Sequence, residues 1–312
     1  MELTRREALH KIATGTASAV AVGAVAVGLP GEAEASGLKH APPEALGLLY
    51  DSTKCIGCQS CVVACAEVNK VSPDTAMSPV HYVNQDLSSF TKNIIKLYKS
   101  PDNSIYSYVK QQCMHCVDPA CVAGCMFKGL KKDAVTGVVT WNGDLCVGCR
   151  YCEIACPSHV PKFEWIGFNP KIVKCELCSD RVTAGQQPGC TSVCPTHAVI
   201  YGKREDLLKE AKSRVKSHPG KYADDKVFGE TDGGGTQVLM LSHVNYDKLG
   251  MPQLDNESVP EKYLKWQKRL YSYLVFPAFL YGSIVAVVRK NWKHHEHEMA
   301  EEEKKTGLRA QL

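Results

Sequence analysis

Cysteine is the residue type whose number and spacing in this sequence indicate chemistry. The 312 residues contain 16 cysteines, and all of them fall into four groups of four. In chain order the groups are Cys55, Cys58, Cys61 and Cys65; Cys113, Cys116, Cys121 and Cys125; Cys146, Cys149, Cys152 and Cys156; and Cys175, Cys178, Cys190 and Cys194. A chain of this length buries enough apolar surface to fold without disulfide bonds. The cysteines therefore predict a bound inorganic group.

The spacing favours iron–sulfur clusters. The third group has the run CxxCxxCxxxCP, which is a known iron–sulfur ligand pattern, and the first group differs only in having Ala66 in place of the proline. Three thiolates at two-residue gaps wrap one face of a [4Fe-4S] cubane. In two-cluster proteins the fourth cysteine binds the neighbouring cluster, so that clusters come in reciprocal pairs. We expect this fourth cysteine to start a helix.

The separation of the groups indicates how they pair. The segment DAVTGVVTWNGD at 133–144 predicts a short hairpin with Gly137 and Asn142-Gly143 as turn residues, which makes the second and third groups one inserted unit. Strand candidates at 48–50 and 198–201 support pairing of the first group with the fourth. The ligand sets are then Cys55, Cys58, Cys61 and Cys194 for cluster 1; Cys113, Cys116, Cys121 and Cys156 for cluster 2; Cys146, Cys149, Cys152 and Cys125 for cluster 3; and Cys175, Cys178, Cys190 and Cys65 for cluster 4.

Disulfides and zinc sites fit the cysteines less well. Disulfides need suitably separated partners, and CxxC pairs are poor local partners for one another. Tetrathiolate zinc sites also use CxxC pairs, but the CxxCxxCxxxC run is not a zinc spacing. Buried thiols alone would not repeat so regularly. His115, His159 and His197 lie near the groups and could replace a ligand or tune a potential, but no cysteine is missing, so packing or N–H donor roles are expected.

The first 35 residues have the pattern of an export signal. Arg5-Arg6 precede an apolar run at 12–29 and the sequence AEA at 33–35, which is the order of a positive region, an apolar region and a cleavage site. The twin arginines predict a twin-arginine signal cleaved after Ala35, a route understood to carry proteins already folded with their cofactors. An uncleaved N-terminal membrane helix is the alternative.

A second apolar stretch predicts one transmembrane helix, with its flanks, over 263–293. Residues 270–288 carry no charge and would extend about 28 Å as a helix, which is close to the thickness of a bilayer core. Trp266 and Trp292 flank the stretch as interfacial anchors do. A buried amphipathic helix is the alternative. Residues 294–312 predict a charged solvated tail, in which His294, His295 and His297 are weak metal candidates.

The composition is that of a globular protein, and the expected ferredoxin-like units make the predicted fold class α+β. The chain is 44% hydrophobic and 22% charged, and its net charge is +4; it lacks the basic excess typical of a nucleic-acid binder. No Walker or Rossmann fingerprint is present. We expect two ferredoxin-like [4Fe-4S] units in a nested arrangement, the first over 36–103 and 161–262 and the second inserted at 104–160. A surface helix is expected at 204–216, and the cysteine-free segments 69–102 and 216–235 are expected to cover the unit or to contact partners.

The four motifs together resemble the iron–sulfur electron-transfer subunits of membrane oxidoreductases, the family of the ferredoxin-like subunits of formate dehydrogenase, nitrate reductase and dimethyl sulfoxide reductase. Within it the chain is most similar to the hydrogenase-2 type. That likeness covers most of residues 45–290 and rests on LYDSTKCIGCQSCVVAC, YVKQQCMHCVDPACV, CVGCRYCEIACPSHVPK and GGGTQVLMLSHVNY. Met126, where a proline usually follows the cysteine, departs from the pattern.

The resemblance implies an electron-transfer subunit that is not itself an enzyme. It implies four [4Fe-4S] clusters, a position on the periplasmic side of the cytoplasmic membrane, and anchoring in lipid by the C-terminal helix. The implied partners are a nickel–iron uptake hydrogenase with its own small iron–sulfur subunit and an integral membrane quinone-reactive subunit; nucleic acid is not a partner. The same role in a formate dehydrogenase or other molybdoenzyme complex is the alternative. A cluster-based enzyme or redox sensor is less favoured, because a catalytic cluster usually leaves one iron open.

Overall fold

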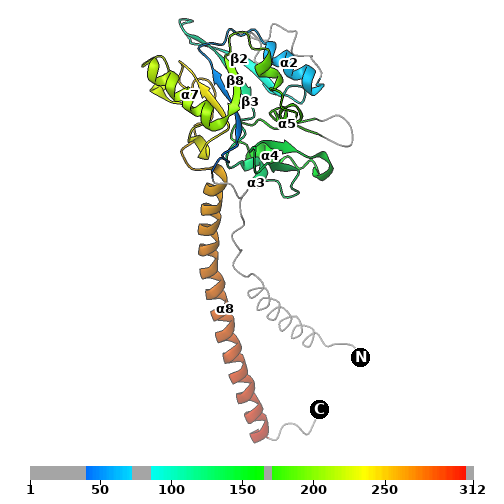
Figure 1. Ribbon diagram of the computed structural model, residues 1–312. Coiled ribbons are helices and arrows are strands. Elements are labelled where there is room, and N and C mark those ends of the chain that lie inside the picture. Colours follow the sequence, from blue (N-terminus) through cyan, green and yellow to red (C-terminus); the bar gives the residue numbers. More distant parts are fainter. Residues whose placement is uncertain (1–39, 72–85, 165–170, 307–312) are drawn as a thin grey trace.

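The computed structural model describes residues 40–71, 86–164 and 171–306, so the predicted export signal lies outside the described residues. One globular part holds all sixteen cysteines, and one long helix leaves it (Figure 1). The strands are β1 (Leu46–Asp51), β2 (Asn93–Lys99), β3 (Tyr106–Gln112), β4 (Leu130–Lys132), β5 (Val139–Trp141), β6 (Lys162–Phe163), β7 (Ile172–Val173), β8 (Val199–Lys203) and β9 (Val238–Leu241). The helices are α2 (Ser60–Asn69), α3 (Ala120–Ala123), α4 (Tyr151–Ala155), α5 (Ser179–Thr183), α6 (Gly189–Ser192), α7 (Arg204–Ser217) and α8 (Val259–Thr306), with short 3-10 turns η2 (Gly143–Leu145), η3 (Ala223–Asp225) and η4 (Asp232–Gly234). The predicted α+β class is confirmed.

Strand β1 is the centre of a three-stranded sheet. It pairs antiparallel with β8, as the two predicted strand segments suggest, and parallel with β9. Because side chains alternate along a strand, Leu48 and Tyr50 pack on the side of the cysteines, whereas Leu49 packs against α7 on the other side. One face of the sheet therefore supports the thiols and the other carries the covering helix.

Helix α7 confirms the surface helix predicted at 204–216. Leu207 and Ala211 are buried against Leu49, and Leu208 and Val215 pack beside them. The acidic first turn and the basic last turn of the helix complement its dipole.

The β4–β5 hairpin confirms one part of the hairpin prediction and contradicts another. The β4–β5 hairpin lies between the second and third groups as expected, with Gly137 in its turn at a φ of 68°. The prediction that Asn142-Gly143 form part of this turn is wrong. Asn142 instead caps η2, because its side-chain oxygen accepts a hydrogen bond from the Asp144 backbone N–H at 2.9 Å.

The β2–β3 hairpin is a second element near the cysteines. Its register runs from Asn93 opposite Gln112 to Lys99 opposite Tyr106, and β2 packs against α2. Strand β2 belongs to the segment 69–102, which we expected to cover the unit or to contact partners. The hairpin instead brings polar residues of both strands next to the thiols.

Helix α8 contains the predicted transmembrane stretch. Its apolar window is exposed, with Tyr271 and Leu274 each 54% accessible and Phe279 75% accessible. The alternative of a buried core helix is therefore wrong. By its length and composition, α8 could cross a membrane, and it is the one such helix in the described residues.

The helix also continues past the expected end of the span. Residues from 294 onward, expected as a separate tail, remain helical to Thr306. Trp292 Nε1 donates to Glu296 Oε1 at 2.9 Å, and His294 Nδ1 lies 3.4 Å from Glu298 Oε1. Pairs one turn apart stabilise a solvated helix, so the charged tail extends α8.

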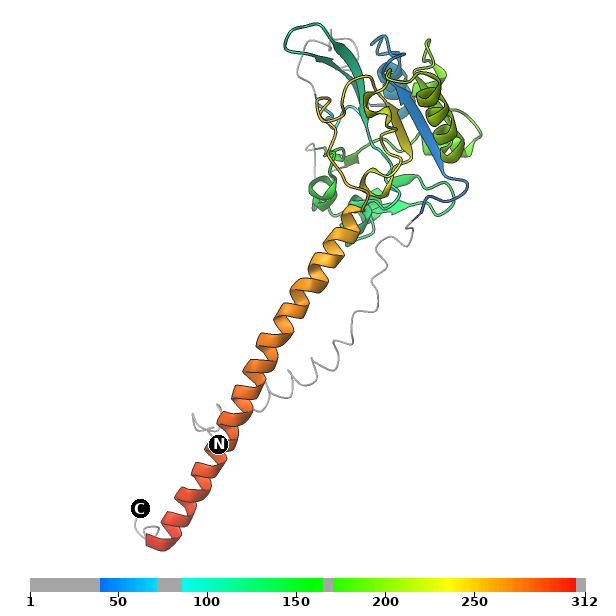
Figure 2. The ribbon, with the colours of Figure 1, turned by 90° about the vertical axis from the view of Figure 1, so that its left-hand side faces the viewer.

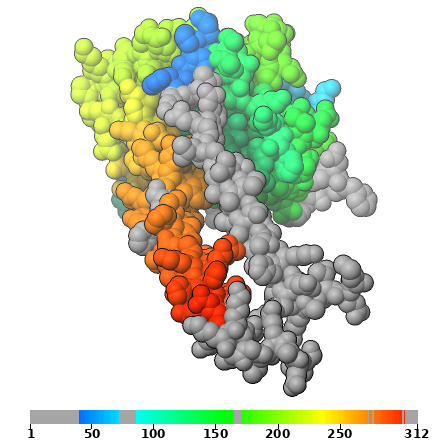
Figure 3. Space-filling model, turned by 90° about the horizontal axis from the view of Figure 1, so that it is seen from below, coloured from blue at the N-terminus to red at the C-terminus, as the bar shows by residue number. Residues whose placement is uncertain are grey.

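The start of α8 is attached to the inner cysteine unit. Ser258 Oγ donates to Asp118 Oδ2 at 2.6 Å, and α8 contacts α3. Figures 1 and 2 show α3 and α4 at the end of the globular part from which α8 leaves, with α2 at the opposite end. Seen from below, the green residues near 150 and the orange start of α8 belong to one face (Figure 3).

Two glycines that face each other in the sheet test its packing. Gly47 of β1 lies opposite Gly202 of β8. A Cβ at Gly47 would overlap the backbone carbonyl oxygen of Gln237, whereas a Cβ at Gly202 would make an ordinary 3.7 Å contact with Leu207. We expect Gly47→Ala to lower the free energy of unfolding by about 1–3 kcal/mol, and Gly202→Ala to leave it unchanged within about 0.5 kcal/mol. Thermal unfolding of the two variants measures this, and equal midpoints would contradict the packing described.

Candidate functional site

The structure brings together thiols from different groups, as the predicted ligand sets require. Set 1 is Cys55, Cys58, Cys61 and Cys194; set 2 is Cys113, Cys116, Cys121 and Cys156; set 3 is Cys146, Cys149, Cys152 and Cys125; set 4 is Cys175, Cys178, Cys190 and Cys65. Sets 1 and 4 each line a cavity that is partly open to solvent. Each cavity thus brings four thiols from two separate groups together.

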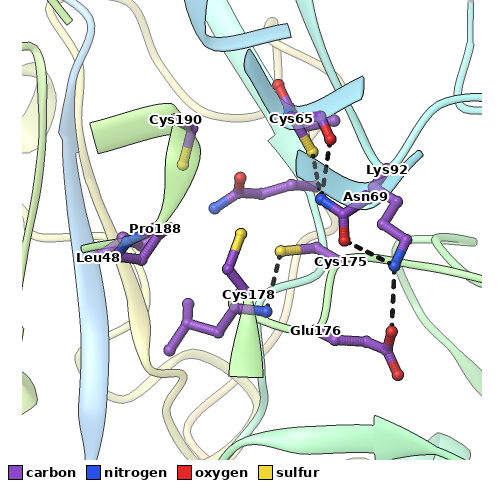
Figure 4. Close-up of a pocket in the computed structure, with 12 residues that line it drawn as sticks. Leu48, Cys65, Asn69, Lys92, Cys175, Glu176, Cys178, Pro188 and Cys190 are labelled. Carbon is purple, nitrogen blue, oxygen red and sulfur yellow. Dashed lines mark hydrogen bonds and ion pairs between the residues drawn. The ribbon is translucent and has the colours of Figure 1, made fainter. Parts of the chain in front are cut away.

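Figure 4 shows how set 4 is assembled from separate elements. Cys65 comes from α2, Cys175 and Cys178 from the loop that enters α5, and Cys190 from α6, and their sulfurs face a common space. Helices α2 and α6 contact each other. Gly189 allows this approach, because a Cβ there would lie 3.0 Å from Val68 and 3.1 Å from the carbonyl oxygen of Ala64.

The thiols of sets 2 and 3 lie close enough to raise one another's pKa. Burial, followed by repulsion from Cys156 and Cys113, raises the pKa of the Cys116 thiol to about 12. Burial, followed by repulsion within its own set, also raises the pKa of Cys152 to about 11. The repelling members are Cys125, Cys146 and Cys149. Thiols grouped in this way become thiolates only when a cation lies between them.

The arrangement does not suit disulfides or single metal ions. All sixteen cysteines lie in the described part of the chain and are free thiols. In that part, no three His, Cys, Asp or Glu side chains come close enough to share one metal ion. A tetrahedral zinc site requires such convergence. The donor sets therefore fit a larger group with several irons, and a [4Fe-4S] cluster bound here would supply one-electron redox chemistry.

The four CxxC loops share one backbone geometry. The residue before the second cysteine has a positive φ in each: 69° at Gly57, 47° at His115, 70° at Gly148 and 54° at Leu177. This left-handed turn is unusual for a side chain as bulky as that of Leu177. It directs the Leu177 N–H to Cys175 Sγ at 3.4 Å. The loops thus present backbone N–H groups to sulfur, which favours the thiolate.

His115 takes part in this geometry through its backbone rather than as a ligand. Its side chain is fully buried, and Nδ1 accepts a hydrogen bond from the Val139 backbone N–H at 3.0 Å. Burial, together with nearby Lys174 and Lys132, lowers the pKa of this imidazole well below its ordinary value. The expected packing role fits these contacts.

A second repeated turn follows the fourth cysteine of the later groups. Lys128, His159 and His197 have φ values of 55°, 47° and 50°, and each donates its backbone N–H to the carbonyl of the cysteine three residues earlier. The next N–H, that of Gly129, then reaches Cys125 Sγ at 3.2 Å. Because Lys128 adopts this turn after Met126, the missing proline does not alter the geometry.

The first group lacks this turn, and a side chain rather than a backbone N–H approaches the sulfur of its fourth cysteine. Cys65 lies inside α2, where the backbone N–H groups that follow serve the helix. The expectation that the helix starts at the fourth cysteine is therefore wrong: left-handed Gln59 leads the chain into α2 before Cys61, and Arg150 does the same at α4. Asn69 compensates, because its Nδ2 lies 3.5 Å from Cys65 Sγ and 2.8 Å from its carbonyl oxygen.

Three lysines near the thiols were not predicted, the half-buried Lys132 and the buried Lys174 and Lys110. Lys132 Nζ donates to the carbonyl oxygens of Cys116 and Gly137 at 2.8 Å each, and burial lowers its pKa to about 8. Lys174 donates to the carbonyls of Val139 and Cys175. Lys110 is the third, in β3 beside sets 1 and 4. A lysine in a polar segment usually indicates an exposed position, so the sequence held little signal for them.

Several pairs of sets lie next to each other. The Cys61 thiol of set 1 acts electrostatically on Cys190 of set 4: burial raises the pKa of Cys190 most, Lys110 lowers it, and Cys65 and then Cys61 raise it further. Cys175 of set 4 packs with Cys113 and Cys156 of set 2 in one apolar cluster. Cys116 of set 2 also packs in the core that holds Cys55, Cys61 and Cys194 of set 1. Sets 2 and 3 share another core.

Comparison with known proteins agrees with this geometry. A family model described as a 4Fe-4S dicluster domain matches residues 104–204. The chain is 38% identical to the Hydrogenase-2 operon protein HybA of Escherichia coli O157:H7, over 90% of this chain and 95% of that protein. The chain belongs to the HybA-like family of iron–sulfur electron-transfer subunits. The predicted resemblance is confirmed.

The HybA-like family is related to the iron–sulfur subunits of formate dehydrogenases. The chain is 32% identical to the formate dehydrogenase, nitrate-inducible, iron-sulfur subunit of Escherichia coli K12, over 66% of this chain and 71% of the relative. It is also 32% identical to the formate dehydrogenase-O iron-sulfur subunit of the same organism, over 74% and 80%. This HybA-like chain is thus an iron–sulfur electron-transfer subunit of hydrogenase-2 or formate dehydrogenase-type complexes, with cysteines that serve [4Fe-4S] clusters.

Proposed function

We propose that each of the four sets holds one [4Fe-4S] cluster and that the chain conducts electrons between a periplasmic nickel–iron hydrogenase and a membrane quinone-reactive subunit. Four thiols per set, backbone N–H donors to sulfur and the absence of single-ion convergence in the described residues support the clusters. Sets 1 and 4 belong to the outer ferredoxin-like unit, and sets 2 and 3 belong to the inserted one.

In this proposal the sets lie in a line in the order 1, 4, 2 and 3, and the exposure of its two ends is the observation that carries it. Cys58 and Cys149 are the two cysteines classed as exposed, and they belong to sets 1 and 3, the two ends of the line. In sets 4 and 2, four cysteines are buried and four are half-buried. A path that is less exposed in the middle than at both ends suits transfer between two partners.

The end at set 3 is the one that we assign to the membrane side. It belongs to the inserted unit to which α8 is attached. Exposed apolar side chains surround it, among them Met126 at 71%, Val147 at 58% and Ile154 at 74%. Apolar side chains grouped around an exposed cysteine are typical of a protein interface. Set 1, at the opposite end, would then receive the catalytic partner.

The helix α8 supports a position above the membrane surface. It starts at Val259, and the uncharged stretch begins eleven residues later, about 16 Å along the helix axis. The globular part therefore lies beyond the headgroup layer while remaining tethered. The twin-arginine pattern supports a periplasmic location, with cleavage after Ala35.

A formate dehydrogenase or other molybdoenzyme is the second candidate for the catalytic partner. It is supported by relatives that match 66–74% of this chain, against 90% for the hydrogenase-2 operon protein. A cluster-based enzyme or sensor is less favoured, because each set has four thiols and leaves no iron open for substrate.

The complete set of cysteines predicts the metal content. Anaerobically purified protein should contain about 16 iron and 16 sulfide per chain, four of each per cluster. Elemental analysis and sulfide determination measure this. Zinc in place of iron, or about 15 iron with a three-iron EPR signal in native unoxidised protein, would contradict four [4Fe-4S] clusters.

The position of Cys65 predicts that it binds the cluster of the fourth cysteine group rather than that of its own group. Cys65→Ser should perturb the same cluster as Cys175→Ser, because both thiols line one cavity, whereas Cys55→Ser should perturb another. EPR spectra of the three reduced variants make the comparison. A common altered signal for Cys65→Ser and Cys55→Ser would exclude the proposed pairing.

Removal of the apolar part of α8 tests the membrane role. A chain that ends at Lys262 keeps every cysteine and the contacts at the start of α8, so cluster content should not change. In the assembled complex, electron transfer from the catalytic subunit to a soluble dye should persist, while quinone reduction falls at least tenfold. Unchanged quinone reduction, with the truncated protein still in the membrane fraction, would show that α8 neither anchors nor docks the subunit.

A further inference from the structure

Lys110 is a buried cation that has an amide as its hydrogen-bonding partner. It lies in β3, is 2% exposed, and lines the cavity of set 1 together with Tyr50 and Ile95. Its Nζ donates to the side-chain oxygen of Asn93 at 2.8 Å. No ion pair found among the described residues includes Lys110. A buried ammonium without an anion is costly, so its counter-charge must come from the surrounding thiolates.

The neighbouring Lys92 shows the contrast. It lines the cavity of set 4, but its Nζ lies 3.1 Å from Glu176 Oε2, and Figure 4 marks this ion pair. Its charge is thus balanced by a carboxylate of the chain. Lys110 lies in β3, which pairs with the strand β2 that begins one residue after Lys92, and its charge is available to whatever occupies the cavities.

Asn93 extends the influence of Lys110 from one cavity to the other. Its side chain lines the cavity of set 4, whereas Lys110 lines that of set 1. Its Nδ2 donates to the carbonyl oxygen of Cys61, a member of set 1, at 3.4 Å. The hydrogen-bonded pair Lys110–Asn93 therefore spans the boundary between the two sets. Four thiols act on the lysine: Cys61 of set 1, and Cys190, Cys65 and Cys175 of set 4.

We propose that Lys110, positioned by Asn93, sets the reduction potentials of clusters 1 and 4 together. The inference rests on the proposed function, because it requires a cluster in each of these two sets. Reduction adds one electron from the partner to a group that already carries four thiolates, and the proton of Lys110 stays on its Nζ. A fixed positive charge in a medium of low dielectric constant stabilises the more negative, reduced state of each cluster. Because it faces both sets, the same charge also reduces the repulsion that one reduced cluster exerts on its neighbour.

The test is an EPR-monitored redox titration of the full-length protein. Lys110→Met keeps the length of the side chain and removes the charge, so the equilibrium constant for reduction of clusters 1 and 4 should fall at least tenfold, which is 59 mV for a one-electron couple. Clusters 2 and 3 should keep their potentials. Lys110→Arg should restore values within threefold of the native protein, since it retains the charge. Lys96→Met, in the same hairpin but 39% exposed, is the matched control and should shift no cluster by more than threefold.

A second variant keeps the inference falsifiable where Lys110→Met fails to fold. Asn93→Asp preserves shape and places an anion on Lys110, so both potentials should again become more negative. Unchanged reduction potentials in Lys110→Met or in Asn93→Asp would overturn the proposal. A fall in potential in Lys110→Met that Lys110→Arg shows as well would also overturn it, because the charge would then not be the cause and Lys110 would have a purely structural role. If the proposed function fails, the native protein itself lacks the EPR signals of clusters 1 and 4. This result differs from a failure of the Lys110 proposal, in which the native signals are present.

Discussion

Four thiolates that share a small space repel one another, and most of the structure around the cysteines compensates for that repulsion. Left-handed turns at Gly57, His115, Gly148 and Leu177 give the four CxxC loops the same backbone geometry, and the Leu177 N–H donates to sulfur. The turns that end at Lys128, His159 and His197 repeat a second motif. Where helix α2 uses up the backbone donors, the Asn69 side chain replaces them. Lys110 and Lys174 add buried positive charge, and the half-buried Lys132 also lies near the thiols. The fold thus supplies donors and cations before any iron is bound.

The sheet accounts for the proposed nested topology. The strands β1 and β8 are far apart in sequence but adjacent in the sheet, and they bring the first cysteine group next to the fourth. The segment between them, which contains the second and third groups, is attached to α8 through Asp118 and Ser258. In the proposed arrangement, the length of α8 before its uncharged stretch determines how far this segment lies from the hydrocarbon region. The exposed Cys58 and Cys149 then lie at the two ends of the proposed line.

Much of this was predictable from sequence because cysteine spacing and period-two or period-3.6 apolar patterns are local signals. The groups, β1, β8, the β4–β5 hairpin, α7 and the long apolar helix follow from such patterns. Lys110, Asn93 and Asn69 could not be predicted, since a polar residue signals burial only when its partners are known, and these partners are distant in sequence. Asn142-Gly143 was misplaced because the same dipeptide suits a hairpin turn or a cap, and the register of β4 with β5 decides between them. The charge of residues 294–312 indicated solvation, but it held no signal that the helix continues to Thr306.

The central claim is that four [4Fe-4S] clusters form a line in the order 1, 4, 2 and 3. Anomalous diffraction at the iron edge from anaerobic crystals of the full-length protein tests it most directly. We expect four separate iron peaks, each at the centre of one set of four cysteine sulfurs, with the peak of set 4 between those of sets 1 and 2 and the peak of set 3 at the α8 end. Three peaks, peaks of a single metal ion each, or a cluster held by cysteines of one group alone would contradict it.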